Sequence, residues 1–187
     1  QRNAGHEDIN DGMQSMKILI VSQYFWPEFF LVNSLATELK ACGHEVTVLT
    51  GLPNYPQGRF FSGFSFWRGP WEQDYSGVRV LRVPLLARGQ GFFRLSLNYL
   101  SFVIFGIFVG PWRVPRDFDV IFCFGISPVT LCLPAIVLRS IFRKPLLFWV
   151  QDLWPESVSA VGATKSKHVI HAIGSIVRFV YRHCDLI

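Results

Sequence analysis

Short apolar runs alternate with segments of helical spacing along most of this chain. Five runs have the apolar, β-branched character of buried strands: KILIVS (17–22), EVTVLT (45–50), VRVLRVPLL (78–86), FDVIFCFG (118–125) and PLLFWV (145–150). Strands that alternate with helices predict a parallel sheet with helices on both faces. We therefore expect an α/β fold built on a Rossmann-like, doubly wound parallel sheet.

Two segments repeat apolar residues at helical spacing. Leu31, Leu35 and Leu39 recur at every fourth residue, and Gly43 supplies a stop signal for that helix. Near the end of the chain an apolar stripe runs from residue 169 to residue 180, with basic residues outside it. The final residues, CDLI, stand where a sixth strand would begin.

The segment after the fourth apolar run carries a start signal for another helix. Ser127 has the residue type of an N-cap, and Pro128 suits the first helical position, where no N–H donor is needed. We expect this helix to run to about Phe142 and to kink at Pro134.

Two segments are larger than a minimal fold of this kind requires. The connection 51–77 is far longer than the usual ~4–6 residues, and it is rich in Phe, Trp and Tyr. The stretch 95–112 is apolar on all sides, with arginines at positions 88, 94, 113 and 116 on its flanks. Its length suggests a membrane span, since ~20 apolar residues cross a bilayer.

Topology argues against a span at 95–112. A single crossing would put the third and fourth strands on opposite sides of the bilayer, where they could not share a sheet. Two interpretations remain: a crossover helix buried on the sheet, or a helix or hairpin, broken at Gly106 and Gly110, that enters one leaflet. We favour a helix with one face on the sheet and the other against lipid.

Composition limits the class of protein. The 187 residues suit one domain with a real core. Aromatic residues make up 16% of the chain, and the net charge is +5. Such a chain suits nucleic acid or an anionic membrane surface, or simply has a solvated basic face. Because the aromatic residues lie within apolar runs, we expect no nucleic-acid partner.

Cysteine usage indicates a reduced protein without a metal site. The four cysteines lack C-x-x-C spacing, and three of them lie in apolar runs. This is typical of core residues in a cytoplasmic protein, and we expect no metal. Residues 1–15 are polar and lack the apolar stretch of a signal peptide, so we expect a disordered leader or tag there and one domain over 16–187.

The stretch FWVQDLWPES (148–157) ends an apolar strand with an amide and an acid. In an open parallel sheet, ligands bind beyond the carboxyl ends of the strands. Gln151 and Asp152 stand at such an end, and Glu156 follows a Trp-Pro turn. An ionised aspartate is costly to bury alone, so Asp152 is either partnered, as in a turn or cap, or open to a ligand.

Polar residues follow other strands at the same predicted edge. A cleft of amides, hydroxyls and aromatic rings with few cations suits a sugar better than a dinucleotide. The predicted substrate-binding residues are Gln23, Tyr24, Asn33, Asn54, Tyr55, Ser127, Gln151 and Glu156. The dinucleotide fingerprint G-x-G-x-x-G is missing after the first strand, and neither a P-loop nor a G-x-S-x-G elbow is evident.

Six stretches of the chain together carry a family resemblance. They are MKILIVSQYFWPE, LATELKACGHEVTVLTGLPNYPQGRF, GVRVLRVPLLARG, RLSLNYLSF, SPVTLCLPAIVLR and FWVQDLWPES. They resemble the N-terminal half of a GT-B-fold, family-four bacterial glycosyltransferase. The resemblance covers residues 16–187 almost continuously and is greatest to fucosamine-transferase-type enzymes of O-antigen and capsule assembly.

The resemblance implies an enzyme that is peripheral at the inner, cytoplasmic face of the bacterial membrane. It implies transfer of an N-acetylated amino sugar from a UDP-sugar to a polyprenyl-diphosphate-linked acceptor, with retention and without a metal or cofactor. Gln151-Asp152 falls where many relatives carry a His or His-Asp pair at the reaction centre. Asp152 is therefore the predicted catalytic residue, orienting the acceptor hydroxyl or stabilising positive charge on the reacting sugar.

The chain departs from the family pattern in two places. Many members have a Gly-Gly pair after the first strand, close to the donor diphosphate. Phe29-Phe30 stand near that position here, which favours acceptor or lipid contact for this loop. The family's nucleotide-sugar site belongs to a second domain, so we expect residues 16–187 to be an acceptor-side domain, truncated before that domain and inactive alone.

Two other hypotheses stay open. The chain could be a non-catalytic membrane-docking subunit of a two-chain glycosyltransferase. It could also be an unrelated Rossmann-type protein that binds NAD or another nucleotide.

Overall fold

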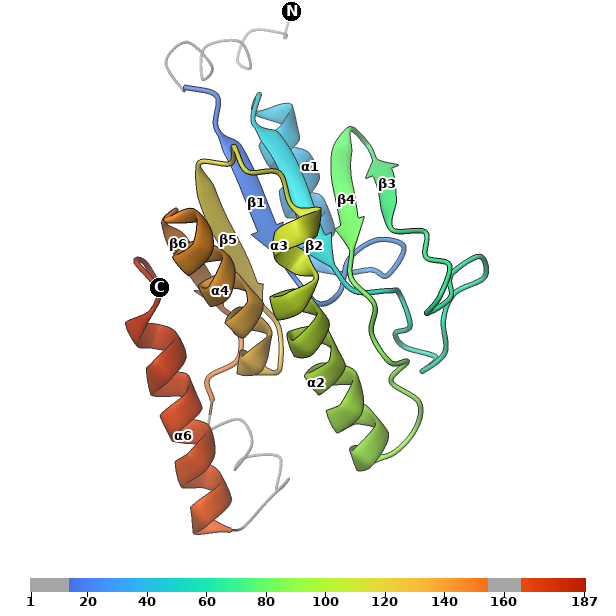
Figure 1. Ribbon diagram of the computed structural model, residues 1–187, viewed down its shortest axis with the longest axis vertical. Coiled ribbons are helices and arrows are strands. Elements are labelled where there is room, and N and C mark those ends of the chain that lie inside the picture. The colour runs from blue at the N-terminus through green and yellow to red at the C-terminus, as the bar shows by residue number, and fades with distance from the viewer. Residues whose placement is uncertain (1–13, 155–165) are drawn as a thin grey trace, which may run out of the picture.

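The computed structural model describes residues 14–154 and 166–187. A six-stranded sheet forms its centre, in the order β3-β4-β2-β1-β5-β6. The strands are β1 (Lys17–Val21), β2 (Glu45–Thr50), β3 (Glu72–Tyr75), β4 (Val78–Arg82), β5 (Val120–Gly125) and β6 (Leu146–Val150). Neighbouring strands are parallel except β3, which pairs antiparallel with β4 (Figure 1).

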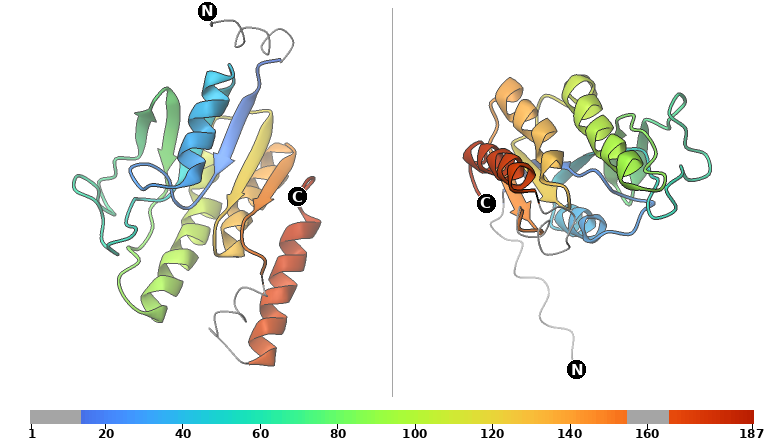
Figure 2. Two further views of the ribbon diagram at one scale, coloured as in Figure 1. Left: turned by 180° about the vertical axis from the view of Figure 1, so that it is seen from behind. Right: turned by 90° about the horizontal axis from the view of Figure 1, so that it is seen from below.

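Helices cover both faces of the sheet. They are α1 (Leu31–Ala41), α2 (Phe92–Phe108), α3 (Gly110–Arg113), α4 (Leu133–Phe142) and α6 (Lys167–Arg182), with a 3₁₀ helix η1 (Val129–Cys132) before α4. Figure 2 shows α1 on one face of the sheet and α2 and α4 on the other. The predicted α/β, doubly wound, Rossmann-like architecture is confirmed.

Strand β1 contributes to two cores because its side chains alternate between the faces of the sheet. Ile18 and Ile20 pack in the apolar cluster beneath α1, together with Val32 of that helix. Leu19 and Val21 pack in the cluster beneath α2 and α4. A central strand that is buried on both faces must be apolar throughout, which is why it reads as an unbroken run.

The long connection 51–77 contains a strand that the apolar pattern does not predict. Strand β3 pairs with β4 through the turn at Ser76 and Gly77, where φ is +53° and +80°. Two positive φ values are typical of a tight two-residue hairpin. The predicted third strand, 78–86, is also shorter than expected, since β4 ends at Arg82.

The predicted start of the helix after β5 is wrong in its details. Ser127 does not cap a helix, and Pro128 precedes η1 instead of opening an α-helix. Pro134 lies in the first turn of α4, where proline fits without a kink because the N–H it lacks has no partner there. The predicted end of the helix at Phe142 is confirmed.

Helix α2 accounts for most of the apolar stretch 95–112. Phe102 and Gly106 on its inner side are buried. Gly106 allows close contact with α4, since a Cβ atom there would lie 2.6 Å from the Cγ of Pro134. The hairpin interpretation is therefore wrong, and packing of one face on the domain is confirmed. None of the helices within residues 14–154 and 166–187 is long and apolar enough to span a membrane.

The last residues extend the sheet beside β6. Leu186 forms a parallel bridge with Leu147, in agreement with the predicted start of a sixth strand. The carboxylate of Asp185 accepts hydrogen bonds from the Arg139 side chain and from the Leu146 N–H. At the other end, residues 1–13 of the predicted leader lie outside the described range, and Ser15 donates a hydrogen bond to the Gly43 carbonyl.

Candidate functional site

Three buried amides connect the loops at the carboxyl end of the sheet. The Gln23 Nε2 donates to the Asn98 Oδ1 at 2.8 Å. The Asn98 Nδ2 donates to the Leu86 carbonyl at 2.7 Å and to the Asn54 Oδ1 at 3.3 Å. Gln23 follows β1, Asn54 follows β2 and Asn98 lies on α2. We call these three residues the amide cluster, and we call the loops and helix that they connect the frame.

A buried carboxylate supports the same loops. The Glu28 side chain, with a residue exposure of 3%, accepts hydrogen bonds through Oε1 from the backbone N–H groups of Asn54 and Tyr55 at 2.7 and 2.6 Å. Burial raises the pKa of Glu28 to about 7, although these hydrogen bonds and Arg82 act in the opposite direction. Glu28 thus carries a titratable proton within the frame near neutral pH.

Arg82 lies buried at the end of β4 and joins two further loops. Its guanidinium donates to the Gly51 carbonyl at 2.9 Å and to the Trp26 carbonyl at 2.5 Å. Burial lowers the pKa of Arg82 to about 10, and nearby Glu28 partly offsets that shift. Since the arginine stays charged at neutral pH, it supplies a fixed cation behind the loops.

Aromatic rings lie between this frame and the surface. Tyr24 stacks on Phe30 with ring centroids 5.1 Å apart, and Tyr55 is 5.7 Å from Tyr24. The Arg88 guanidinium lies 5.3 Å from the centroid of the Tyr55 ring. Burial raises the pKa of the Tyr24 hydroxyl well above its usual value. Tyr55 is exposed, so this ring can meet a ligand.

A second polar group forms at the ends of β5 and β6. The Ser127 hydroxyl donates to the Asp152 Oδ2 at 2.5 Å, and the Trp154 Nε1 donates to the Ser127 Oγ at 3.0 Å. Asp152 and Gln151 are exposed. The carboxylate of Asp152 is therefore both partnered and open to solvent, which combines the two alternatives that the sequence left open.

Seven of the eight predicted substrate-binding residues are described, and they differ in burial. Those that lie buried in or beside the frame are Gln23, Tyr24, Asn33 and Asn54. Those that reach the surface are Tyr55, Ser127 and Gln151. Glu156 lies outside the described residues. Substrate contact stays a prediction for all of them, but the frame gives the buried amides a structural task.

The two groups share no hydrogen bond in the described part of the chain, and the single cleft expected from the sequence stays a prediction. Within residues 14–154 and 166–187, no hydrogen bond links the Asp152–Ser127 pair to the amide cluster. Both groups lie beyond the carboxyl ends of the strands, because β2, β1, β5 and β6 are neighbouring parallel strands whose carboxyl ends meet at one edge. Their common feature is thus the sheet edge and not a shared contact.

Sequence reasoning missed Glu28, Arg82 and Asn98. Each carried a signal: Asn98 is a lone amide in an apolar stretch, and Arg82 is a cation that follows Leu81 within a strand pattern. A polar residue in such a place needs a buried partner, since an unpaired one is costly. Glu28 gave a weaker signal, because acids are common after a proline in loops.

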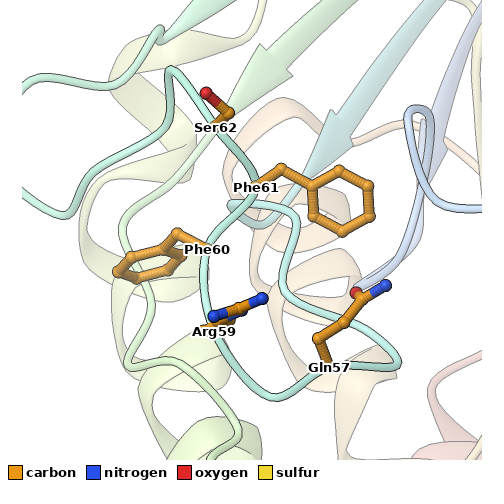
Figure 3. Close-up of a pocket in the computed structure, with 5 residues that line it drawn as sticks. All are labelled: Gln57, Arg59, Phe60, Phe61 and Ser62. Carbon is orange, nitrogen blue, oxygen red and sulfur yellow. The ribbon is translucent and has the colours of Figure 1, made fainter.

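A hollow of about 420 Å³ lies in the connection after β2. Gln57, Arg59, Phe60, Phe61 and Ser62 line it, and Figure 3 shows the rings of Phe60 and Phe61 on opposite sides of the loop. Among the described parts of the chain, no three His, Cys, Asp or Glu side chains gather in a way that could hold a metal ion.

Comparison with known proteins identifies the family. Residues 31–187 match the model of the glycosyl transferase 4-like domain, and the chain belongs to this family. The chain is also 28% identical over 153 residues to the Escherichia coli (strain K12) protein named "Putative colanic acid biosynthesis glycosyl transferase WcaI". That alignment covers 79% of this chain and 37% of the relative, so the chain spans little more than a third of that protein's length.

Proposed function

We propose that this chain is the acceptor-binding half of a glycosyltransferase. The whole enzyme transfers an N-acetylated amino sugar from a UDP-sugar to a polyprenyl-diphosphate-linked acceptor in surface polysaccharide assembly, such as O-antigen or capsule. The observation that carries the proposal is the family match over residues 31–187. The similarity to a protein named for colanic acid biosynthesis supports a biosynthetic role of this kind.

Asp152 is the group on which the proposed chemistry depends. Its carboxylate is exposed beyond β6, and the Ser127 hydroxyl holds one oxygen, Oδ2. The other oxygen accepts no hydrogen bond from the described residues, so it can accept one from a sugar hydroxyl. There it orients the acceptor or stabilises the positive charge that develops on the transferred sugar.

The donor contacts belong to a part of the protein outside this chain. We propose that a second domain holds the UDP-sugar, that transfer proceeds with retention and needs no metal, and that this chain alone binds acceptor without turnover.

The outer side of α2 and α3 supports a peripheral position on the inner face of an anionic membrane. Leu100, Ile104, Phe108 and Trp112 are exposed and recur every four residues, so they form one stripe. Exposed apolar stripes with basic neighbours are typical of helices that lie in the membrane interface. The same stripe supports the alternative function, a non-catalytic subunit that docks another chain on the membrane.

Sugar transfer by the protein that carries this chain tests the proposal. Asp152→Asn keeps the size of the side chain and its hydrogen-bond acceptor but removes the charge, and we expect transfer to fall at least about 100-fold. Asp119→Asn makes the same change at an exposed position just before β5, at the opposite edge of the sheet. It is the control and should change transfer less than about fivefold. If Asp152→Asn left transfer unchanged while a separate subunit supplied the activity, the docking alternative would be correct.

A further inference from the structure

Two loops meet at a fixed backbone junction near the start of α2. The Gly89 N–H donates to the Gly58 carbonyl at 2.8 Å. A Cβ atom on Gly58 would lie 2.6 Å from the Gly89 carbonyl oxygen, so the contact requires glycine there. The neighbouring Arg88 N–H donates to the Asn54 Oδ1 at 2.9 Å. The connections after β2 and β4 are thus held together by the same frame that contains the amide cluster.

Three arginines lie next to this junction, two in the sequence and one in space. Arg59 follows Gly58, Arg88 precedes Gly89, and a Cβ atom on Gly89 would lie 2.9 Å from the Cδ of Arg94. In the described parts of the chain, none of the three has a carboxylate within ion-pair distance, whereas Arg79 and Arg139 do. We name Arg59, Arg88 and Arg94 the arginine junction. It gathers positive charge that the described residues leave uncompensated.

Apolar rings adjoin the arginine junction. Phe92 and Phe93, the first residues of α2, are 81% and 73% exposed. They stand between Gly89 and Arg94 in the sequence, and the outer stripe of α2 continues from their end of the helix. A cationic cluster beside free aromatic rings matches a ligand that has a phosphorylated head and an apolar tail.

We infer that the arginine junction binds the diphosphate of a prenyl diphosphate and that Phe92 and Phe93 contact the first isoprenoid units. The inference rests on the proposed function for the class of acceptor, and it adds the place on this chain where the acceptor is held. Guanidinium groups match phosphate oxygens through paired N–H donors, and a diphosphate offers several such oxygens. Because the loops are already fixed to each other, little ordering is needed on binding.

Binding of farnesyl diphosphate to this chain, measured by titration calorimetry, tests the head-group contacts. The triple variant R59Q/R88Q/R94Q should bind at least about tenfold more weakly, since charge-assisted hydrogen bonds are lost. The matched control R68Q/R143Q/R178Q removes the same charge from exposed arginines outside the junction. It should change the affinity less than twofold. Equal weakening by both triple variants would overturn the inference.

A second pair of variants tests the tail contacts. The double variant F92S/F93S should weaken farnesyl diphosphate binding about tenfold and leave inorganic pyrophosphate binding unchanged, because pyrophosphate has no tail. The control F179S removes a partly exposed ring from α6 and should leave both affinities unchanged. If F92S/F93S left farnesyl diphosphate binding unchanged, the tail contact would be refuted.

Vesicles separate this site from general membrane attraction. The arginine triple variant and its matched control have the same net charge and an intact outer stripe. They should therefore bind phosphatidylglycerol vesicles within about threefold of each other. Loss of vesicle binding with farnesyl diphosphate binding retained would overturn the inference. Farnesyl diphosphate binding that no arginine affects would overturn it too, yet leave the proposed function standing. That function is judged separately, by sugar transfer in Asp152→Asn.

Discussion

The two polar groups at the carboxyl edge of the sheet differ in what they do with their hydrogen bonds. The amide cluster and Glu28 direct theirs inward, to backbone groups and to one another, and are buried. Asp152 is exposed, and among residues 14–154 and 166–187 its side chain has one hydrogen-bond partner, Ser127. Apart from Asn98 on α2, both groups come from polar residues in the loops that follow apolar strands. Polar residues are therefore expected at strand ends in general. Those with several hydrogen-bond partners inside the protein support the fold, and those with few partners stay available to a ligand.

The largest effect should come from Arg82, the buried cation of the frame. Arg82→Met removes donors from the Gly51 and Trp26 carbonyls and leaves Glu28 without a nearby positive charge. We expect a loss of about 3–5 kcal/mol in the free energy of unfolding, measured with urea. Arg79 on the same strand pairs with Glu72 at the surface, and Arg79→Met should cost less than about 1 kcal/mol. Similar losses in both variants would contradict a special role for the buried arginine.

The second prediction concerns pH. Glu28 has a pKa of about 7 in the folded protein, above its ordinary value of 4.5, so the folded state holds this proton more tightly than the unfolded state. Its contribution to stability is complete below pH 4.5 and is lost as the pH rises to about 7, a fall of about 3 kcal/mol. Glu28→Gln should lack this fall, while keeping an oxygen for the two N–H donors. Urea unfolding at pH 4.5, 6 and 7.5 measures the difference, and parallel curves for the two proteins would refute it.

The third prediction compares amides from the two groups. Asn54→Ala removes the oxygen that accepts from Asn98 and from the Arg88 N–H. The partly buried Arg88 N–H then loses its acceptor, and the Asn98 Nδ2 keeps only its bond to the Leu86 carbonyl. We expect a cost of about 2 kcal/mol in the free energy of unfolding. Gln151→Ala, at an exposed position, should cost less than about 0.5 kcal/mol. The comparison between the groups would fail if Gln151 proved as costly as Asn54.

The smallest change in stability is expected at the residue with the greatest proposed effect on chemistry. Asp152→Asn keeps an acceptor for Ser127, and its side chain is exposed. The free energy of unfolding should change by less than about 0.5 kcal/mol. Thermal and urea unfolding of the same preparation used for sugar transfer provide the measurement. A loss above about 2 kcal/mol would mean that Asp152 belongs to the structural frame.

Much of the fold could be predicted because apolar runs mark strands that are buried on both faces. The strand 45–50 was placed at its observed bounds, and the strand expected at 118–125 begins two residues later in the structure. Strand β3 could not be predicted from apolar runs, because its sequence, EQDY, is polar and its strand conformation depends on pairing with β4. The dipeptide Ser76-Gly77 was the available local sign of that hairpin.

The candidate site was harder to predict, because burial is a property of the assembled domain. Gln23 and Gln151 are the same residue type at equivalent strand ends, yet one lies under α2 and the other faces solvent. What separates them is Asn98, some 75 positions along the chain from Gln23. No local pattern encodes a partner at that distance. The lone asparagine in an apolar helix was the sign that such a partner was needed.

The missing side chain at Gly106 governs more than local packing. Helix α2 contacts Pro134 at that point, and the same helix carries Asn98 on its inner side and most of the exposed apolar stripe on its outer side. Any residue larger than glycine would place a side chain against Pro134 and force α2 to move away from α4. The orientation of the exposed stripe and the hydrogen bonds of Asn98 would then change together. The absence of a side chain at one position therefore sets the angle between α2 and the rest of the domain.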